Sequence, residues 1–272
     1  MTAAGAAQKT EEAAQKAQPW LEPLARFGYV AKGFIYGQIG MLALMPAVGR
    51  QGKFVNQKGA IQTVAQMQFG AVILYAIAIG LAAYSTWRLL MAIFNPEGKK
   101  PFKRIGYGIT ALAYYALGFA ALQAAMHQSK GSNGGMQKWA GLVDTPWGRA
   151  LAVAIGLGLI ALAIGQSINA FKSKFMDNLD KTSMDEKERK LATVSGKLGL
   201  WARAVVFLLT GGFLIRAGLD ASPREAGGMS KALQTLAAAP YGRFLLGAVA
   251  FGLVAYAVFQ FVEARYRRIR AA

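Results

Sequence analysis

The chain lacks the side chains on which most enzyme active sites depend. Its 272 residues include no cysteine and one histidine, His127, and its 13 acidic residues face 31 lysines and arginines. Without cysteine there are no disulfides, thiolate nucleophiles or iron–sulfur ligands. No HExxH, Walker or GxGxxG motif is present, and Glu263 is the one acid within a hydrophobic segment. Because proton relays and intramembrane hydrolysis need buried acids, histidines, metals or activated nucleophiles, we expect no enzyme, no metal site and no cofactor.

Apolar residues dominate the composition although the net charge is strongly positive. They make up 54% of the chain, the mean hydropathy is +0.30 and the formal charge is +18. Hydrophobic segments of about 21 residues or longer can cross a hydrocarbon core of roughly 30 Å as helices. Such segments cover residues 27–48, 69–94, 105–126, 149–171, 198–219 and 243–263. We therefore predict an all-α integral membrane protein with six transmembrane helices.

A block of about 78 residues occurs three times, and each copy is predicted to be one helical hairpin. The copies are marked by glycines at equivalent positions. Gly28, Gly106 and Gly199 open them, Gly40, Gly118 and Gly211 follow twelve residues later, and Gly80, Gly158 and Gly252 lie in the second halves. The predicted boundaries are a polar N-terminal tail (1–23), hairpin repeats at 24–98, 101–176 and 195–269, and a polar linker (177–194). Three tandem hairpins predict pseudo-threefold symmetry.

The repeated glycines form a stripe with an aromatic residue at offset eight: Tyr36, Tyr114 and Phe207. Offsets zero, four, eight and twelve lie on one ridge of a helix. Glycines on such a ridge let helix backbones approach closely, so we interpret all nine as helix-packing residues. The alternative is that the same stripe lines a cavity.

The basic residues are distributed unequally between the two ends of the predicted spans. One side, which includes both termini, carries 21 lysines and arginines and the other carries 10. The positive-inside rule therefore places both termini in the cytoplasm. Since the basic residues are confined to loops and helix ends, we expect no nucleic-acid partner. The predicted partners are the lipid bilayer, with anionic lipid on the cytoplasmic side as a candidate ligand, and another membrane protein.

One repeated position near the helix starts is polar. It is occupied by Lys32, Thr110 and Arg203, and its counterparts near the ends of the second helices are Arg88, Gln166 and Gln260. Ionisable groups within membrane spans are functional candidates. We hypothesise that these six residues form a polar ring that binds anionic lipid headgroups or gates a path. The alternative is that the long basic side chains extend to the interface.

The loops carry local signals of their own. In the linker, which we interpret as a solvated segment, Ser183 and Glu186 fit a capping box. Each outer loop contains a short amphipathic stretch, at 59–68, 135–146 and 228–240, followed by an aromatic–glycine pair. The aromatic residue is predicted to lie at headgroup level and the glycine to allow the turn into the bilayer. The three pairs are Phe69–Gly70, Trp147–Gly148 and Tyr241–Gly242.

The repeat motifs resemble those of the bacterial domain-of-unknown-function 1206 family. Its copies run as Gly-x-x-[AV]-[KR]-Gly-x-x-[YF], Ala-Leu-x-x-Leu-Ala-x-x-Pro-[YF]-Gly and Gly-Leu-x-x-Tyr-x-x-[WF], which residues 28–36, 232–242, 80–87 and 252–259 match. The resemblance implies a bacterial inner-membrane protein of three hairpins and implies no activity. Copy two departs from the motifs at Thr110, Ala111, Leu162 and Gly165.

Two functions fit these patterns. The first is a non-catalytic scaffold, partner-binding or lipid-organising protein. The second is a passive channel or carrier for a small solute or ion along the pseudo-threefold axis. The two differ in whether the repeated residues close the centre of the molecule or line an opening through it.

Overall fold

The computed structural model describes residues 3–50, 52–94, 101–127, 145–220 and 228–268. Within these ranges the fold is all-α, without a strand. The helices are α1 (Ala3–Ala47), α2 (Gln57–Ala65), α3 (Gly70–Phe94), α4 (Pro101–His127), α6 (Pro146–Phe171), α7 (Glu186–Leu219), α8 (Met229–Ala238) and α9 (Gly242–Tyr266). Two 3₁₀ turns, η1 (Lys174–Asn178) and η2 (Lys181–Ser183), precede α7.

Five of the described helices are long and apolar enough to cross a membrane: α3, α4, α6, α7 and α9. The chain is therefore a multi-pass membrane protein. The sixth predicted span lies in α1, which is not among the five because Lys32 and Gln38 interrupt its apolar sequence. The predicted N-terminal tail is not a separate element in the structure, since α1 is one helix from Ala3 onwards.

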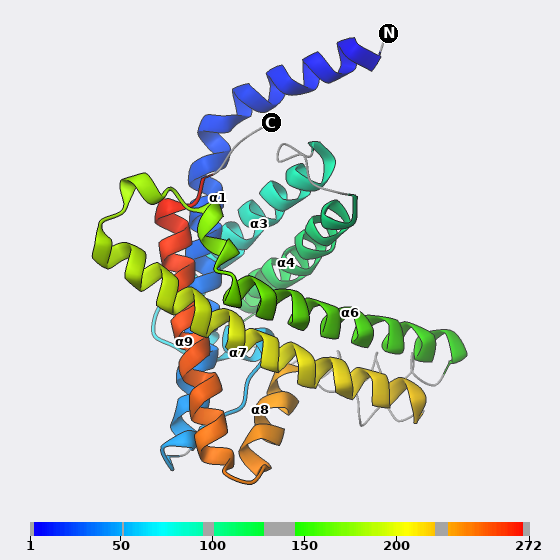
Figure 1. Cartoon of the computed structure of the whole chain (residues 1–272), viewed down its shortest axis with the longest axis vertical. Coiled ribbons are helices and arrows are strands. Elements are labelled where there is room, and N and C mark those ends of the chain that lie inside the picture. Colours follow the sequence, from blue (N-terminus) through cyan, green and yellow to red (C-terminus); the bar gives the residue numbers. More distant parts are fainter. Residues whose placement is uncertain (1–2, 51, 95–100, 128–144, 221–227, 269–272) are drawn as a thin grey trace.

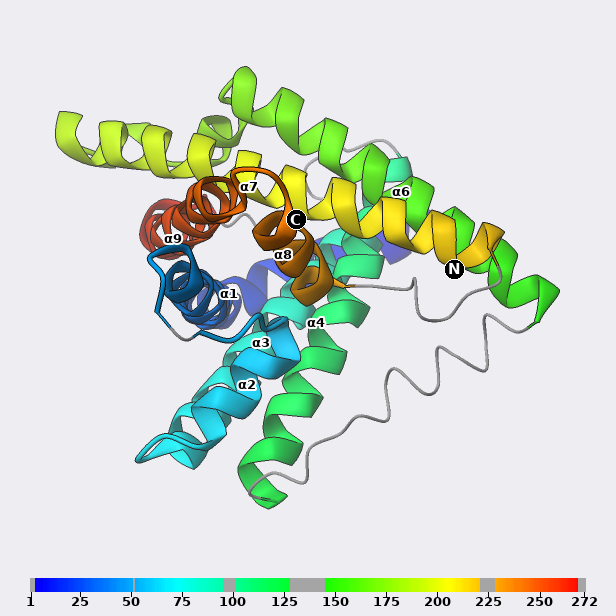
Figure 2. The ribbon, with the colours of Figure 1, turned by 90° about the horizontal axis from the view of Figure 1, so that it is seen from below.

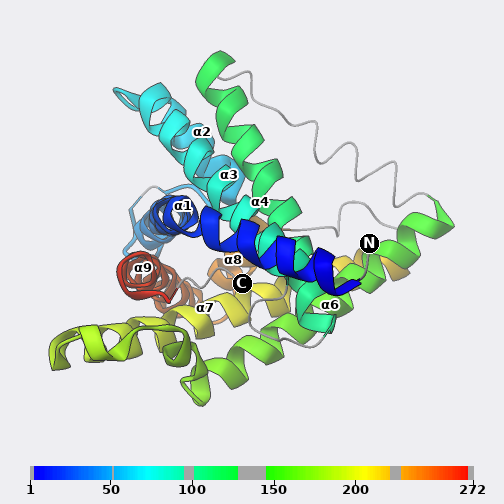
Figure 3. The same ribbon diagram turned by 90° about the horizontal axis from the view of Figure 1, so that it is seen from above.

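Helices of different copies form the most extensive pairs. The second helix of each copy packs along the first helix of the next copy, as α3 with α4 and α6 with α7, and α9 packs along α1. Figure 1 shows α1 and α9 running together at a steep angle to α6 and α7. Figures 2 and 3 show the same pairs from the two ends, with α3 and α4 as the third pair. The predicted pseudo-threefold symmetry of the three hairpins stays a prediction.

Within a copy, α1 packs on α3 and α7 packs on α9, whereas the described parts of α4 and α6 do not pack extensively. Glycines lie where these helices touch. A Cβ atom on Gly28 would lie 2.4 Å from the Cβ of Tyr84, and one on Gly199 would lie 2.5 Å from the Cα of Tyr256. Because such distances are impossible for a real Cβ, these two contacts require glycine.

The other marked glycines divide into two groups. Gly40, Gly80, Gly211 and Gly252 lie against a neighbouring helix, with a Cβ on each within 2.9 Å of another heavy atom, and Gly118 is slightly less crowded at 3.3 Å. At Gly106 and Gly158, in α4 and α6, a Cβ would meet nothing within 4 Å. The structure therefore gives these two positions no packing reason for glycine.

The turns that lead into α3 and α9 are made by the aromatic residue and not, as we predicted, by the glycine. Phe69 and Tyr241 have φ of 63° and 59°, in the left-handed region. A Cβ on Gly70 or Gly242 would lie 2.1 Å from a carbonyl oxygen of the preceding turn. Glycine is thus needed for the close approach, and the residue before it adopts the left-handed conformation. Tyr241 is 88% exposed, and its placement at headgroup level stays a prediction.

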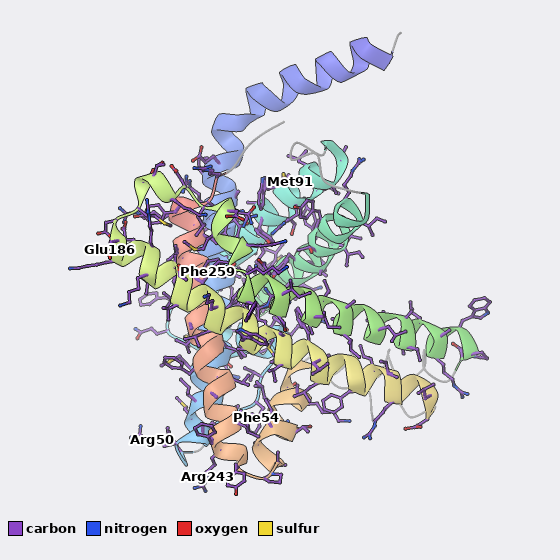
Figure 4. All side chains as sticks on the ribbon, viewed as in Figure 1. Arg50, Phe54, Met91, Glu186, Arg243 and Phe259 are labelled. Atoms are coloured by element: carbon purple, nitrogen blue, oxygen red, sulfur yellow. The ribbon has the colours of Figure 1, made fainter. Side chains whose placement is uncertain are left out.

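The linker is docked on the end of α9 and is not simply a solvated segment. The backbone N–H of Asp180 donates to the carbonyl of Tyr266 at 2.8 Å, and that of Arg268 donates to the carbonyl of Asn178 at 3.0 Å. Just before the linker, the ring of Phe175 lies edge-on to Phe259, 5.1 Å between centroids. Figure 4 shows Phe259 on α9, Glu186 at the start of α7 on the left side of the view, and Arg50 and Arg243 near its lower end.

The predicted capping box is displaced by two residues. The Asp185 side chain accepts from the backbone N–H of Glu188 at 2.7 Å, and the Glu188 side chain accepts from the backbone N–H of Asp185 at 3.1 Å. Ser183 lies two residues before the N-cap, and its hydroxyl donates to Asp180 at 2.6 Å. The prediction of Ser183 and Glu186 was therefore wrong, and α7 begins at Glu186 as one helix continuous with the following span.

Asp180 fixes the linker, and replacement of Asp180 is expected to release the linker from the end of α9. The Asp180 carboxylate accepts from Ser183 and Thr182 at 2.6 Å each and from Arg268 at 3.2 Å. We expect Asp180→Ala to speed tryptic cleavage after Lys181 by about tenfold, since the open population rises with each lost hydrogen bond. Asp177→Ala, which removes only the exposed ion pair to Lys181, is the control.

The same carboxylate sets how the docking depends on pH. The Ser183 hydroxyl, followed by Thr182 and Arg268, holds the pKa of Asp180 well below its ordinary value of about 3.9. A depressed pKa stabilises the docked form above the ordinary value, and this stabilisation is lost as the pH falls through the folded value. The docked population of the linker should therefore be unchanged between neutral pH and about pH 4, measured by hydrogen exchange of its backbone amides corrected for the intrinsic pH dependence of exchange. Release near pH 6 would contradict the role of Asp180.

Candidate functional site

The centre of the helix assembly contains lysine and arginine side chains packed on aromatic rings. Lys32 of α1 is 5% exposed. Its Nζ lies 5.3 to 5.9 Å from four ring centroids that come from α1, α3, α4 and α9: Tyr29, Tyr84, Tyr114 and Tyr256. Among the described residues, no carboxylate forms an ion pair with Lys32. The ring faces are therefore the groups that stabilise this buried ammonium.

Arg203 and Arg88 continue the arrangement on either side of Lys32. The Arg203 guanidinium lies 4.6 Å from the Tyr256 ring centroid and donates to the Tyr256 hydroxyl. The Arg88 guanidinium lies 5.1 Å from the Tyr84 ring centroid, and its Nε donates to the Tyr84 hydroxyl at 2.9 Å. Cations and rings thus alternate in the order Arg88, Tyr84, Lys32, Tyr256, Arg203. We call these five residues the cation–tyrosine row.

The buried acid of the region lies to one side of the row. Glu263 forms an ion pair with Arg267 and accepts from the Gln260 side chain at 2.8 Å. Both partners come from α9 or its end, so the carboxylate is satisfied locally. Gln260, fully buried, therefore faces Glu263 through its amide group. The three cations of the row keep no carboxylate of their own among the described residues.

A cavity of about 520 Å³ adjoins the row. It is lined from α1, α2, α4, α6, α7 and the residue before α2. The lining residues are Tyr36, Asn56, Gln57, Lys58, Ile109, Thr110, Ala113, Tyr114, Ala116, Leu117, Leu162, Gln166, Arg203 and Phe207. A cavity of this size is in the range of small-molecule sites.

Two polar atoms of the lining residues are buried without a hydrogen-bond partner among the described residues. They are the Nε of Arg203, a donor, and the Oε1 of Gln166, an acceptor. Buried polar atoms in native structures are nearly always paired, so an unpaired donor and acceptor beside one cavity suggest a ligand with both functions. The hydroxyl of Thr110 is already satisfied, since it donates to the carbonyl of Gly106 at 2.7 Å.

The structure therefore distributes the six residues of the predicted polar ring over three places. Thr110, Gln166 and Arg203 line the cavity. Lys32 and Arg88 lie behind it in the cation–tyrosine row, and Lys32 reaches the cavity wall through the ring of Tyr114. Gln260 lies with Glu263, away from the cavity lining. No group of His, Asp or Glu in the described residues could hold a metal ion.

Sequence reasoning missed the part played by the tyrosines. Tyr36 and Tyr114 stood out only as members of a packing stripe, and Tyr84 and Tyr256 occupy equivalent positions in copies one and three. A signal was present, because tyrosine carries a polar hydroxyl that a pure packing residue does not need. Tyr84 lies one helical turn before Arg88, and this spacing could have identified that part of the row.

The comparisons agree with this architecture. The family model described as Domain of Unknown Function (DUF1206) matches three times, at residues 27–95, 105–173 and 198–267. A Bacillus subtilis (strain 168) relative, Uncharacterized protein YxxB, is 32% identical over 261 residues, which cover 94% of each chain. No solved structure was found to match. The three matches coincide with the three predicted hairpins, and the chain belongs to the DUF1206 family.

Proposed function

We propose that this chain is a non-catalytic protein of the bacterial cell membrane, with both termini in the cytoplasm, that binds and organises an anionic lipid. The headgroup would lie in the cavity beside Arg203. The observation that carries the proposal is the buried, unpaired Nε of Arg203 and Oε1 of Gln166 at a cavity of about 520 Å³.

Charge favours an anion at this place. Buried charges are normally paired because the loss of hydration costs several kcal/mol per ion, yet Lys32, Arg88 and Arg203 have only aromatic partners among the described residues. A phosphate diester between α4 and α7 would supply the missing counter-charge. The guanidinium of Arg203 offers the forked donor geometry that phosphate oxygens accept.

The headgroup of such a lipid also needs a donor for Gln166. An amide oxygen accepts one or two hydrogen bonds, so a headgroup with free hydroxyl groups, such as glycerol, complements the unpaired Oε1. Positions 32, 110 and 203 lie near the helix starts predicted to be cytoplasmic, where anionic lipids give the membrane surface its negative potential. These points together favour phosphatidylglycerol over a zwitterionic lipid.

The alternative, a passive channel or carrier, finds less support in the same geometry. The Lys32 side chain and its four rings fill the region where the copies meet, and Lys32 is 5% exposed. An ammonium fixed among rings in this way favours a binding site over a continuous path.

Arg203→Gln is expected to lower retention of phosphatidylglycerol by about tenfold, equivalent to the roughly 1.4 kcal/mol of one charge-assisted hydrogen bond. Native mass spectrometry of the full chain, purified in mild detergent with added phosphatidylglycerol or phosphatidylcholine, measures the bound fraction. Arg216→Gln, an exposed arginine on the same helix, is the control and should not change it.

A second variant covers the case in which Arg203→Gln fails to fold. Gln166→Glu places a negative charge at the cavity with almost no change of volume, and should also reduce phosphatidylglycerol retention. Equal retention of both lipids by wild type and variants would disprove the proposal. Anion flux through proteoliposomes that Arg203→Gln abolishes would instead support the carrier.

A further inference from the structure

Copy two has an open interface where copies one and three have a closed one. Gly28 lies against Tyr84, and Gly199 lies against Tyr256, at distances that exclude any side chain on the glycine. The equivalent pair in copy two is Gly106 and Leu162. A Cβ on Gly106 meets no heavy atom within 4 Å, and the same holds for Gly158 one turn before Leu162. The helices α4 and α6 are therefore apart along a face that touches in the other copies.

The sequence of copy two explains the opening. Tyr84 and Tyr256 are 1% and 2% exposed because they fill the space between the helices of their copies, whereas Leu162 is 56% exposed. Copy two also has Thr110 in place of Lys32 and Arg203, so it contributes no cation to the row. Without the large ring and the cation, the described part of copy two lacks the contacts that hold the two helices together in copies one and three.

The opening is continuous with the cavity. Ile109 and Ala113 of α4 and Leu162 of α6 line the same cavity as Arg203 and Gln166. The cavity therefore combines cationic groups, Arg203 and Lys58, with apolar wall residues. A free phosphate ion would use only the cationic groups, whereas a membrane lipid has both an anionic headgroup and apolar chains.

We propose that the gap between α4 and α6 holds an acyl chain of the anionic lipid, which enters sideways from the bilayer with its headgroup directed at Arg203. The proposal rests on the headgroup site proposed above and adds its entrance and the class of ligand. Gly106 and Gly158 keep this gap wide, because larger residues there would project into it.

The gap can be filled without disturbing the fold. Since nothing lies within 4 Å of a Cβ at Gly106 or Gly158, Gly106→Leu and Gly158→Leu should fold, and leucine favours the helix over glycine. Gly108→Leu is the matched control, since its position is equally open and lies about 160° around α4 from Thr110, on the other face.

The experiment uses the full chain in phosphatidylcholine vesicles that contain phosphatidylglycerol with a photoactivatable group on its acyl chain. We expect labelling of peptides from α4 and α6, reduced by about tenfold in Gly158→Leu and Gly106→Leu and unchanged in Gly108→Leu. Inorganic phosphate, tested as the soluble probe, should compete weakly. Unchanged labelling in both gap variants, or full displacement by inorganic phosphate, would overturn the lateral site.

The two proposals fail in different ways. If Arg203→Gln loses the lipid while both gap variants keep it, the headgroup site stands and the acyl-chain site is wrong. If the gap variants lose the label while Arg203→Gln keeps it, the protein binds lipid in the gap without the proposed headgroup contact.

Discussion

Gly199→Leu is expected to unfold the protein in detergent, whereas Gly106→Leu, at the equivalent position of copy two, is expected to leave it folded. A Cβ on Gly199 would lie 2.5 Å from the Cα and 2.6 Å from the Cβ of Tyr256, so α7 and α9 would have to separate. Overpacking of a rigid interface costs about 3 kcal/mol, and here the obstacle is backbone, which cannot rotate away.

The separation of α7 from α9 would also disrupt the cation–tyrosine row. Tyr256 contacts both Lys32 and Arg203, at 5.3 and 4.6 Å from its ring centroid. Displacing this ring would leave two buried cations with fewer partners, which adds to the cost of the overpacking. The variant is therefore expected to lose more stability than an ordinary glycine substitution in a helix, which usually gains some.

Thermal unfolding followed by fluorescence-detected size exclusion measures the difference. Gly199→Leu should elute as aggregate at temperatures where wild type is monodisperse, and Gly106→Leu should match wild type. Gly28→Leu, whose Cβ would lie 2.4 Å from that of Tyr84, should behave like Gly199→Leu. A common response of all three variants would contradict the distinction between a closed and an open copy.

This contrast marks the limit of prediction from the sequence. The repeated glycines and the six hydrophobic segments are local patterns, and they predicted the family and the all-α architecture. The glycines of copy two have the same spacing, so spacing alone could not distinguish Gly106 from Gly28. What differs is the residue opposite, Leu162 in place of tyrosine, and its effect depends on how the helices meet.

The cations were predicted as a group and their partners were not. Lys32, Arg88 and Arg203 stood out as charges within apolar segments, a local property. That they bind tyrosines of other helices depends on contacts far apart in the chain, such as Lys32 with Tyr256. The error in the capping box has a similar cause, because the backbone of Asp180 is held by the end of α9 and α7 then begins only at Glu186.

The row leads to a prediction in which stability and binding change in opposite directions. Lys32→Met replaces a buried ammonium by an apolar side chain of similar length. Contacts with the four rings stabilise the desolvated ammonium of Lys32 by about 2 kcal/mol or more. Against this stand a desolvation cost of several kcal/mol and repulsion from Arg203, which shares the Tyr256 ring. We expect the variant to be more stable than wild type by about 1 to 4 kcal/mol.

The same substitution should weaken the binding of the anionic lipid. The ammonium of Lys32 lies behind the Tyr114 ring that forms part of the cavity wall, so its charge acts on a headgroup at Arg203 through a region of low dielectric. We expect Lys32→Met to bind phosphatidylglycerol about tenfold more weakly and to leave phosphatidylcholine unchanged. Lys231→Met, which removes a lysine placed over the single ring of Phe213, is the control.

Thermal unfolding in the absence of lipid, together with native mass spectrometry in its presence, separates the possible roles of Lys32. A purely structural lysine would lose stability and lipid together when it is replaced. If Lys32 is needed for its charge, the Lys32→Met variant should have a higher unfolding temperature and a lower lipid occupancy than wild type. The reason is that wild type carries an unpaired buried cation, and the bound anion offsets its cost in stability. Added phosphatidylglycerol should accordingly raise the unfolding temperature of wild type and have little effect on that of Lys32→Met.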